Sequence, residues 1–296
     1  MKIFLTGASG FLGRHITAEL VAAGHEVAGL VRSDAGAETV RAQGGTPVRG
    51  DIESPASLDA ALAEAEGAIH TAFDHDFARF KENCENDRRL IEHMATQLAL
   101  TGAPLVVTST TMVAERAQGH PARETDGPKS SKVSPRAASE EAVATALETR
   151  AKVSVVRLPQ VHDREKYGLV TNLLQIAQRT GVSAYIGAGE NRWCAAHLLD
   201  VARLYRLAIE SGTSGARWHA VAEGAIPFVD IAAAVSERTG TEMRSLSPEE
   251  AQAHFGPFVH LVGTDAWSDS TLTRERLSWE PSGPSLLDDL KQLSAS

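Results

Sequence analysis

The amino-acid sequence predicts an α/β fold in which a doubly wound parallel sheet carries a glycine-rich turn at its centre. The first observation is the apolar run Lys2 to Leu5, which has the character of a buried central strand and leads into a turn that begins at Gly7. The second is the alternation of strand-like apolar runs with helix-like periodic stretches through the N-terminal half. Parallel strands need crossover connections, and these periodic stretches supply them.

Each expected element follows from a local pattern. Short apolar runs bounded by Gly, Pro or charged residues predict strands, and apolar residues three and four apart predict helices. The helices are expected at residues 14–23, 35–42, 57–64 and 77–100. The strands are expected around Ile3, Val27, Pro47, Ala68 and Leu105, and then at residues 153–158 and 216–221. The stretch 117–135 is rich in Pro, Ser and Gly, which is typical of a loop over an active site.

The composition disfavours several classes of protein. The chain has 296 residues, 43% of them hydrophobic, which is enough to bury a full core, and its net charge of −9 disfavours nucleic acid or an anionic membrane as a partner. Cys84 and Cys194 stand far apart with no metal-ligand spacing, so no metal site is predicted and a reducing compartment is expected. The first strand begins at residue 2 and no apolar run is long enough to span a membrane, so we expect a cytoplasmic protein.

The glycine-rich turn has the features of a dinucleotide-binding loop. Gly7 allows a tight turn, Gly10 lets the backbone approach a pyrophosphate, and Gly13 lets the following helix pack closely on the strand. The N-terminus of that helix offers free N–H groups to an anion. The residues expected to bind the cofactor here are Gly7, Ser9, Gly10, Phe11, Leu12 and Gly13.

The G-x-x-G-x-x-G spacing after Thr6 resembles the extended short-chain dehydrogenase/reductase superfamily, which includes nucleotide-sugar epimerases and dehydratases. The resemblance implies a Rossmann domain that binds a dinucleotide and a small C-terminal domain that binds a small-molecule substrate. We expect the NADP-binding Rossmann domain over residues 1–160, completed by about 194–222. The small substrate-binding domain is expected over 161–193 and 223–296. A homodimer is the candidate assembly.

The end of the second expected strand predicts NADP(H) rather than NAD(H). An enzyme that selects NAD usually places an acidic residue there to bind the ribose 2′-hydroxyl, but Val31 stands at that position. Arg32 and Ser33 follow, and a guanidinium with a hydroxyl suits a 2′-phosphate. The alternative is that Arg32 is an ordinary exposed loop arginine.

Other segments also resemble cofactor-binding parts of the superfamily. Asp51 and Ile52 match its adenine-binding box, although Asp51 could equally cap the next helix. Asn86 matches a helix asparagine of the superfamily. The remaining cofactor contacts that the resemblance implies are Ala72, Phe73, Thr108, Pro159 and Val161. The predicted substrate contacts are Asp74, His75, His162, Tyr167 and Arg192, and the first four are also the candidates for the proton donor.

The resemblance fails at the catalytic pair. The superfamily combines a Ser or Thr after the fifth strand with Tyr-x-x-x-Lys on the next helix, where Tyr transfers a proton and Lys lowers its pKa and holds the ribose. Thr110 keeps the first position, but Arg136 stands where Tyr belongs and Glu140 where Lys belongs. A guanidinium cannot donate a proton near neutrality but can polarise a carbonyl, so Thr110 and Arg136 are the catalytic candidates. The alternative is that Arg136 and Glu140, four residues apart on a helix, form a surface ion pair.

Two functions from different classes remain. The first is an NADP-dependent oxidoreductase or epimerase that acts on a small polar, carbonyl-bearing or sugar-like substrate, with water or a loop residue as the proton donor. The second is a catalytically silent NADP-binding redox sensor or scaffold, because loss of both Tyr and Lys commonly accompanies loss of hydride chemistry. Retention of Thr110 and Arg192 favours the enzyme, since a sensor needs only the cofactor site.

Overall fold

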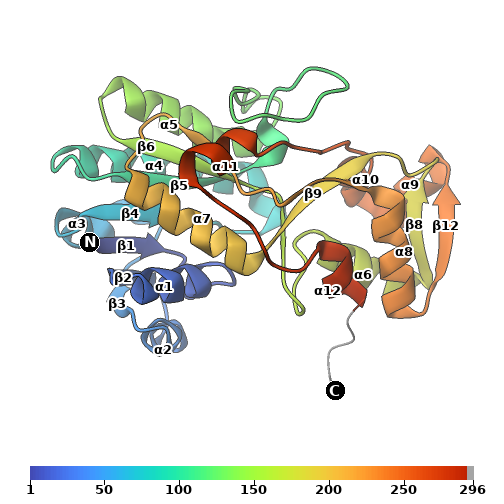
Figure 1. Ribbon diagram of the computed structural model, residues 1–296, viewed down its shortest axis with the longest axis horizontal. Coiled ribbons are helices and arrows are strands. Elements are labelled where there is room, and N and C mark those ends of the chain that lie inside the picture. Colours follow the sequence, from blue (N-terminus) through green and yellow to red (C-terminus); the bar gives the residue numbers. More distant parts are fainter. Residues whose placement is uncertain (292–296) are drawn as a thin grey trace.

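The structure, a computed structural model, describes residues 1–291 and has two lobes (Figure 1). The larger lobe is built on a seven-stranded sheet in the order β10-β6-β5-β4-β1-β2-β3, in which every neighbouring pair is parallel. The predicted doubly wound α/β fold is therefore confirmed. The strands are β1 (Lys2–Thr6), β2 (Glu26–Val31), β3 (Thr46–Arg49), β4 (Gly67–His70), β5 (Leu105–Thr110), β6 (Val153–Leu158) and β10 (Arg217–His219).

Helices cover both faces of this sheet, and the two faces carry separate apolar cores. One face is covered by α1 (Gly13–Ala22), α2 (Asp34–Ala42) and α7 (Leu198–Ser211). The other is covered by α3 (Asp59–Ala63), α4 (Phe80–Ala99) and α5 (Ala138–Glu148), and the turn η4 (Pro135–Ala137) leads into α5. Because both faces are buried, the strands have continuous apolar runs, and this is why the sequence predicted them at these places.

The strand order reverses beside β1, since the chain places β2 and β3 on one side of it and β4, β5, β6 and β10 on the other. The connections that follow β1 and β4 therefore diverge at the carboxyl edge of the sheet. Ligands of open parallel sheets bind at this kind of reversal.

The smaller lobe has its own apolar core. It contains α6 (Val170–Thr180), α8 (Phe228–Thr239), α9 (Pro248–Phe255), α10 (Val259–Val262), α12 (Leu286–Lys291) and the parallel pair β8 (Val182–Ile186) and β12 (Glu242–Leu246). A three-stranded sheet of β7 (Gln160–His162), β9 (Arg192–His197) and β11 (Glu223–Pro227) leads into it from the larger lobe (Figure 1). Trp193 and Phe228 pack edge to face in this core, with ring centroids 5.0 Å apart.

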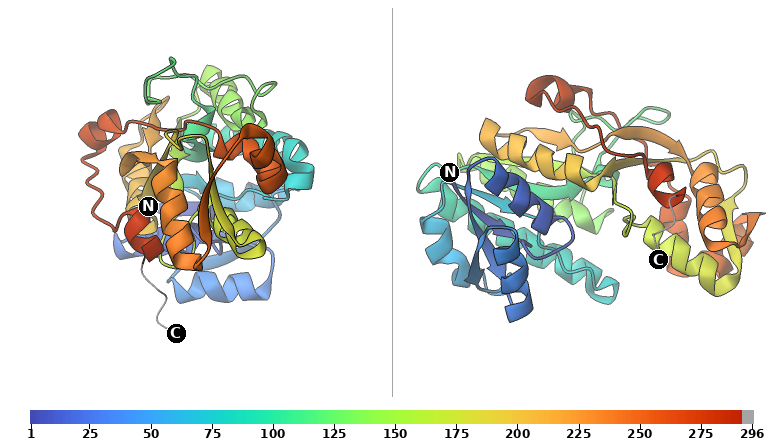
Figure 2. Two further views of the ribbon diagram at one scale, coloured as in Figure 1. Left: turned by 90° about the vertical axis from the view of Figure 1, so that its right-hand side faces the viewer. Right: turned by 60° about the horizontal axis from the view of Figure 1, so that its bottom comes forward.

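The C-terminal part of the chain returns to the larger lobe before it enters the smaller one again at α12 (Figure 2). Helix α11 (Thr271–Leu277) packs on α7, and the fully buried Trp279 donates its indole N–H to the Asp200 carbonyl at 2.9 Å. The Asp200 carboxylate then accepts from the backbone N–H of Gly283 at 2.7 Å. The expected domain division stays a prediction, and residues 292–296 of its last segment lie outside the described residues. Within residues 1–291, no helix has the length and apolar character needed to cross a bilayer.

Candidate functional site

The turn after β1 has no room for side chains at its glycines. Gly7 has a φ of +72°, and a Cβ there would lie 2.6 Å from Thr71 Oγ1 and 2.8 Å from the backbone nitrogen of Ala72. A Cβ on Gly13 would overlap the Gly7 carbonyl, and one on Gly10 would lie 3.2 Å from the same oxygen. The backbone thus approaches its neighbours as closely as a phosphate-binding loop requires.

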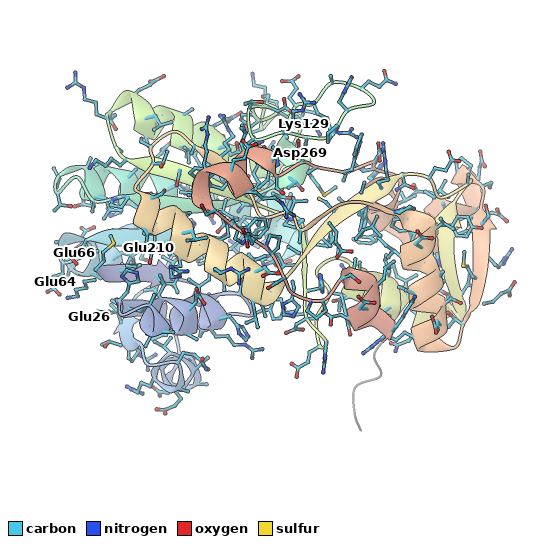
Figure 3. All side chains as sticks on the ribbon, in the orientation of Figure 1. Glu26, Glu64, Glu66, Lys129, Glu210 and Asp269 are labelled. Atoms are coloured by element: carbon cyan, nitrogen blue, oxygen red, sulfur yellow. The ribbon has the colours of Figure 1, made fainter. Side chains whose placement is uncertain are left out.

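The same turn leaves donors for an anion. In the described part of the chain, the backbone N–H groups of Phe11 and Leu12, which precede α1, donate no hydrogen bond. The acidic side chains of Glu26, Glu64 and Glu66 gather at the opposite, amino-terminal edge of the sheet (Figure 3). The free N–H groups and the positive end of the α1 dipole suit negatively charged phosphates, and the residues of this turn fit the dinucleotide that the sequence predicts.

Arg32 is exposed at the end of β2, and no other residue of the range 1–291 forms a hydrogen bond or ion pair with its side chain. Its neighbour Arg49 is instead paired with Asp34. Ser33 has a structural role as the cap of α2, because its hydroxyl accepts from the Gly36 N–H at 3.1 Å. Arg32 is therefore the unpaired cation at the position where the sequence predicted a 2′-phosphate contact.

Ser9 lies beside the cap of α2. A Cβ added to Gly36 would lie 3.3 Å from the Ser9 hydroxyl and 3.4 Å from the Ser33 hydroxyl, so the two serines flank the start of α2. Both hydroxyls thus stand between the turn after β1 and the end of β2.

A small pocket lies between the loop after β3 and the N-terminal half of α4. Asp51 folds that loop by accepting from the Glu53 N–H at 3.0 Å, and Ile52 turns towards the pocket. Asn83 is buried, and its amide nitrogen donates to the carbonyls of Asp74 and Asp76 while its Oδ1 has no partner in the described residues. The pocket is lined by Ile52, Glu53, Phe73, Asp74, Asn83, Asn86, Asp87 and Leu90.

Asn83 was missed by the sequence analysis, which selected Asn86 on the same helix. Asn86 is partly exposed and accepts a hydrogen bond from Arg89, whereas Asn83 is buried and has a free amide oxygen. The signal that could have found Asn83 is its position one turn nearer to the start of α4, because helix N-termini face the carboxyl edge of a doubly wound sheet.

Arg136 is held in a buried polar network. Its Nη1 donates to Asp87 Oδ2 at 2.8 Å and to the Ser139 hydroxyl, and its Nη2 donates to the Thr108 carbonyl at 3.0 Å. Its guanidinium carbon lies 4.3 Å from the centroid of the Phe73 ring. A guanidinium has five N–H groups and three of them are engaged here, which leaves two to donate.

The network continues from Asp87 to the end of β1. His70 is buried and lies between Asp87 Oδ1, 2.9 Å from its Nε2, and Thr6 Oγ1, 2.7 Å from its Nδ1. Burial favours the protonated form of Asp87, but the Arg136 charge and hydrogen bonds from His70 and Ser139 outweigh it and lower the pKa to about 2. Thr6 in turn accepts from the N–H groups of the segment after β4. The Arg136 position is therefore connected to the nucleotide-binding turn.

Glu140 has a different role from the lysine it replaces. It is 2% exposed, and the buried Arg157 donates to its two oxygens through Nε and Nη2, both at 2.8 Å. Ser109 and Arg217 donate to it at 2.8 and 3.0 Å. Burial alone would raise its pKa, but Arg157 dominates and holds the pKa below its ordinary value. Glu140 joins α5 to the sheet and is not free to hold a ribose.

The alternative of a surface ion pair between Arg136 and Glu140 is wrong. Arg136 belongs to η4, which starts at Pro135, whereas Glu140 lies in the first turn of α5. The change of helix type turns Arg136 towards α4 and Glu140 towards the sheet. The Glu140 side chain is buried, the Arg136 side chain is partly buried, and each has other partners.

Thr110 and the segment after β4 are the more accessible parts of the site. The Thr110 hydroxyl accepts from the Met112 N–H at 3.4 Å, so its own hydrogen stays free to donate. Thr108 is instead engaged through its hydroxyl with the His70 carbonyl at 2.7 Å and the Tyr205 hydroxyl at 2.6 Å. The solvent-accessible His75 contacts the Phe73 carbonyl at 3.1 Å, and partial desolvation of its imidazole, together with the charges of Arg136 and Lys166, lowers its pKa. Partly exposed Ala72, Phe73 and Asp74 line the same segment.

The structure does not bring three predicted substrate residues into this network. His162 is fully buried, with Nδ1 at 2.8 Å from an oxygen of the buried Asp289. The Tyr167 hydroxyl is also buried and donates to the Arg164 carbonyl at 2.6 Å. Arg192 forms a two-fold hydrogen-bonded ion pair with Asp265, at 3.1 and 2.8 Å.

The Arg192 guanidinium carbon also lies 3.7 Å from the centroid of the Trp267 ring, so the ring covers one face of the guanidinium. Pro159 is partly exposed between β6 and β7, and Val161 is buried against the core around α1. Among residues 1–291, no group of three or more His, Cys, Asp or Glu side chains is placed to hold a metal ion.

Fold and site together define a member of the short-chain dehydrogenase/reductase superfamily, in the branch that contains the NAD-dependent epimerases and dehydratases. Residues 1–257 match the family model described as the RmlD substrate binding domain, and the chain belongs to that family. Two uncharacterized yeast proteins are similar over nearly their whole length: one from Schizosaccharomyces pombe, 40% identical over 98% of both chains, and one from Saccharomyces cerevisiae, 36% identical over 98% of both.

Solved structures agree with this fold. A dTDP-glucose 4,6-dehydratase from Streptomyces venezuelae with NAD bound matches with a TM-score of 0.76 at 18% identity, covering 98% of this chain and 95% of the other. A UDP-glucose 4-epimerase from Thermus thermophilus in complex with NAD matches with a TM-score of 0.75 at 20% identity, covering 98% and 99%.

Proposed function

We propose that this protein is an NADP-dependent oxidoreductase or epimerase that acts on a small polar, carbonyl-bearing or sugar-like substrate. The observation that carries the proposal is the combination of an intact phosphate-binding turn with an unpaired Arg32 at the end of β2. An NAD-selective site would have a carboxylate near this position, which would repel a 2′-phosphate. The family membership and the NAD bound in two similar structures support a dinucleotide cofactor.

The bound cofactor would supply the hydride, and the chain's own residues bind and orient the substrate. Thr110 has a free hydroxyl hydrogen with which to hold a substrate oxygen. Arg136 has two unused N–H groups and a charge that is fixed by Asp87 and Phe73, so it can polarise a carbonyl without moving. Both residues occupy positions where the superfamily places groups that act on the substrate.

The proton must come from elsewhere, because an arginine pKa above about 12 excludes guanidinium as a proton donor near neutrality. Of the four predicted substrate contacts that carry a carboxyl, imidazole or phenol group, His162 and Tyr167 are buried and already engaged with other groups. Asp74 and His75 keep accessible side chains. An imidazole can relay a proton between water and a substrate oxygen near neutral pH, and the lowered pKa of His75 favours its neutral form.

A second function, a catalytically silent NADP-binding sensor or scaffold, is favoured by one specific observation. The residues that replace the Tyr and Lys are both locked in buried ion pairs, with Asp87 and with Arg157. A site that no longer catalyses a reaction can use these two positions for structural ion pairs.

The two functions are distinguished by turnover. Purified protein should oxidise NADPH, or epimerise substrate with catalytic cofactor, in a screen of aldehydes, ketones, imines and nucleotide sugars. Thr110→Val should lower kcat/KM at least roughly tenfold with little loss of NADPH affinity, because it removes only a substrate contact. Unchanged activity in Thr110→Val would remove Thr110 from the mechanism. Tight NADPH binding without turnover across the panel would favour the sensor.

A further inference from the structure

A tight hairpin at residues 162–167, directly after β7, lies against the start of α1. Asp163 folds the hairpin, since its Oδ1 accepts from the backbone N–H groups of Glu165 and Lys166 at 2.8 Å and its own N–H donates to the Lys166 carbonyl at 2.9 Å. A β-bridge between His162 and Tyr167 closes the hairpin. The backbone of Lys166 is therefore fixed by local hydrogen bonds.

The Lys166 side chain reaches from this hairpin to the nucleotide-binding turn. Its Nζ lies 5.2 Å from the centroid of the Phe11 ring, and Phe11 follows Gly10 in that turn. The Lys166 charge also contributes to the lowered pKa of His75, in the segment after β4. Within residues 1–291 its ammonium has no hydrogen-bond or ion-pair partner.

The Lys166 ammonium lies close to other positively charged groups at the start of α1. The N-terminus of α1 carries partial positive charge, the N–H groups of Phe11 and Leu12 are free, and Arg14 stands one residue inside the helix without a carboxylate partner in the described chain. An ammonium next to these groups is unfavourable unless an anion lies between them. The contact with Phe11 holds Lys166 near the turn without neutralising it.

We propose that Lys166 binds the diphosphate of the dinucleotide from the side opposite the glycine-rich turn. This inference rests on the proposed function, because it names a further residue of the same cofactor site. The hairpin follows β7, which pairs with β9, and β9 leads into the smaller lobe. The contact between Lys166 and the diphosphate would therefore connect the smaller lobe to the cofactor.

Equilibrium titration with NADPH and with NADH tests the contact without any turnover. Lys166→Met removes the charge and keeps most of the side-chain length, Lys166→Arg keeps the charge, and Arg164→Met removes a neighbouring exposed charge from the same hairpin. Since both cofactors share the diphosphate, Lys166→Met should raise both dissociation constants by the same factor, about tenfold or more. It should also make binding less sensitive to salt. Lys166→Arg and Arg164→Met should bind within about twofold of wild type.

Several results would overturn the inference. Unchanged affinities in Lys166→Met, or a loss confined to NADPH, would show that Lys166 does not bind the shared diphosphate. A loss of kcat with unchanged affinity for both cofactors would place Lys166 at the chemistry instead. Failure of wild-type protein to bind either cofactor would overturn the proposed function and this inference with it. Because Lys166 has no ionic partner and stands beside other positive groups, the melting temperature of unliganded Lys166→Met should be no lower than that of wild type, which controls for misfolding.

Discussion

Restoring the lysine of the superfamily at position 140 should damage the fold. Glu140 is 2% exposed and Arg157 is fully buried, so their two-fold hydrogen-bonded ion pair is shielded from water. Glu140→Lys removes the carboxylate and places a third cation beside Arg157 and Arg217. Breaking a buried pair by removing one partner costs about 3–5 kcal/mol. For a chain of this length, that corresponds to a fall in melting temperature of roughly 5–8 °C.

A matched control lies on the same helix. Glu148 is exposed at the C-terminal end of α5 and forms no ion pair in the described part of the chain. Glu148→Lys makes the same change in charge, and a cation there suits the helix dipole, so the free energy of unfolding should change by less than about 0.5 kcal/mol. Glu140→Gln should fall between the two, because its amide oxygen still accepts from Arg157.

Urea denaturation followed by tryptophan fluorescence measures all three variants. Equal stability of Glu140→Lys and Glu148→Lys would refute the assignment of Glu140 as a buried structural partner. The double variant Arg136→Tyr with Glu140→Lys rebuilds the superfamily motif in sequence. It should not gain efficient turnover, because it leaves the Asp87 and Arg157 charges without their partners.

Three further predictions concern other parts of the account. Arg136→Ala should lower the free energy of unfolding by about 3 kcal/mol because it leaves the buried Asp87 carboxylate without its charged partner, whereas Arg136→Lys should lower it less. Both variants should lower kcat/KM at least roughly tenfold, and an unchanged kcat/KM would show that Arg136 has a purely structural role. Burial and the Arg157 charge lower the pKa of His219 to about 4, below its ordinary 6.5, so the unfolded state binds more protons between these values. The free energy of unfolding should therefore fall by about 1–2 kcal/mol from pH 7 to pH 5, and His219→Gln should lose this dependence; an equal slope in both proteins would contradict the assignment. Gly13→Ala should abolish NADPH binding or folding, because its Cβ overlaps a backbone carbonyl, and normal binding by that variant would show that the turn is looser than described.

The sequence predicted the strands of the central sheet well because buried parallel strands have a strong local signal. Lys2–Thr6 and Leu105–Thr110 contain short apolar runs that are buried on both faces, and the turn after β1 has glycines at fixed spacing. Both signals lie within a few residues of chain. The placement of Thr110 and Arg32 near the carboxyl edge follows from the same local patterns.

The partners of charged residues could not be predicted in this way, because they come from distant parts of the chain. Arg136 pairs with Asp87, 49 positions away, and Glu140 pairs with Arg157 on a neighbouring strand. The four-residue spacing of Arg136 and Glu140 suggested a local pair, but the turn that begins at Pro135 changes the direction of the first side chain. The place of Trp279 is likewise set by distant contacts, because it packs in the core of the larger lobe, to which the chain returns through α11.

Cofactor preference is the most direct test of the central claim that this chain is an NADP-dependent member of its superfamily. Calorimetric titration of wild-type protein should show NADPH binding about tenfold or more tighter than NADH, which corresponds to one charge-assisted contact to the 2′-phosphate. Arg32→Ala should remove that difference by weakening NADPH alone, while Arg41→Ala, which removes an exposed arginine of α2 paired with Glu38, should preserve it. Equal affinities in the wild type, or tighter binding of NADH, would contradict the account.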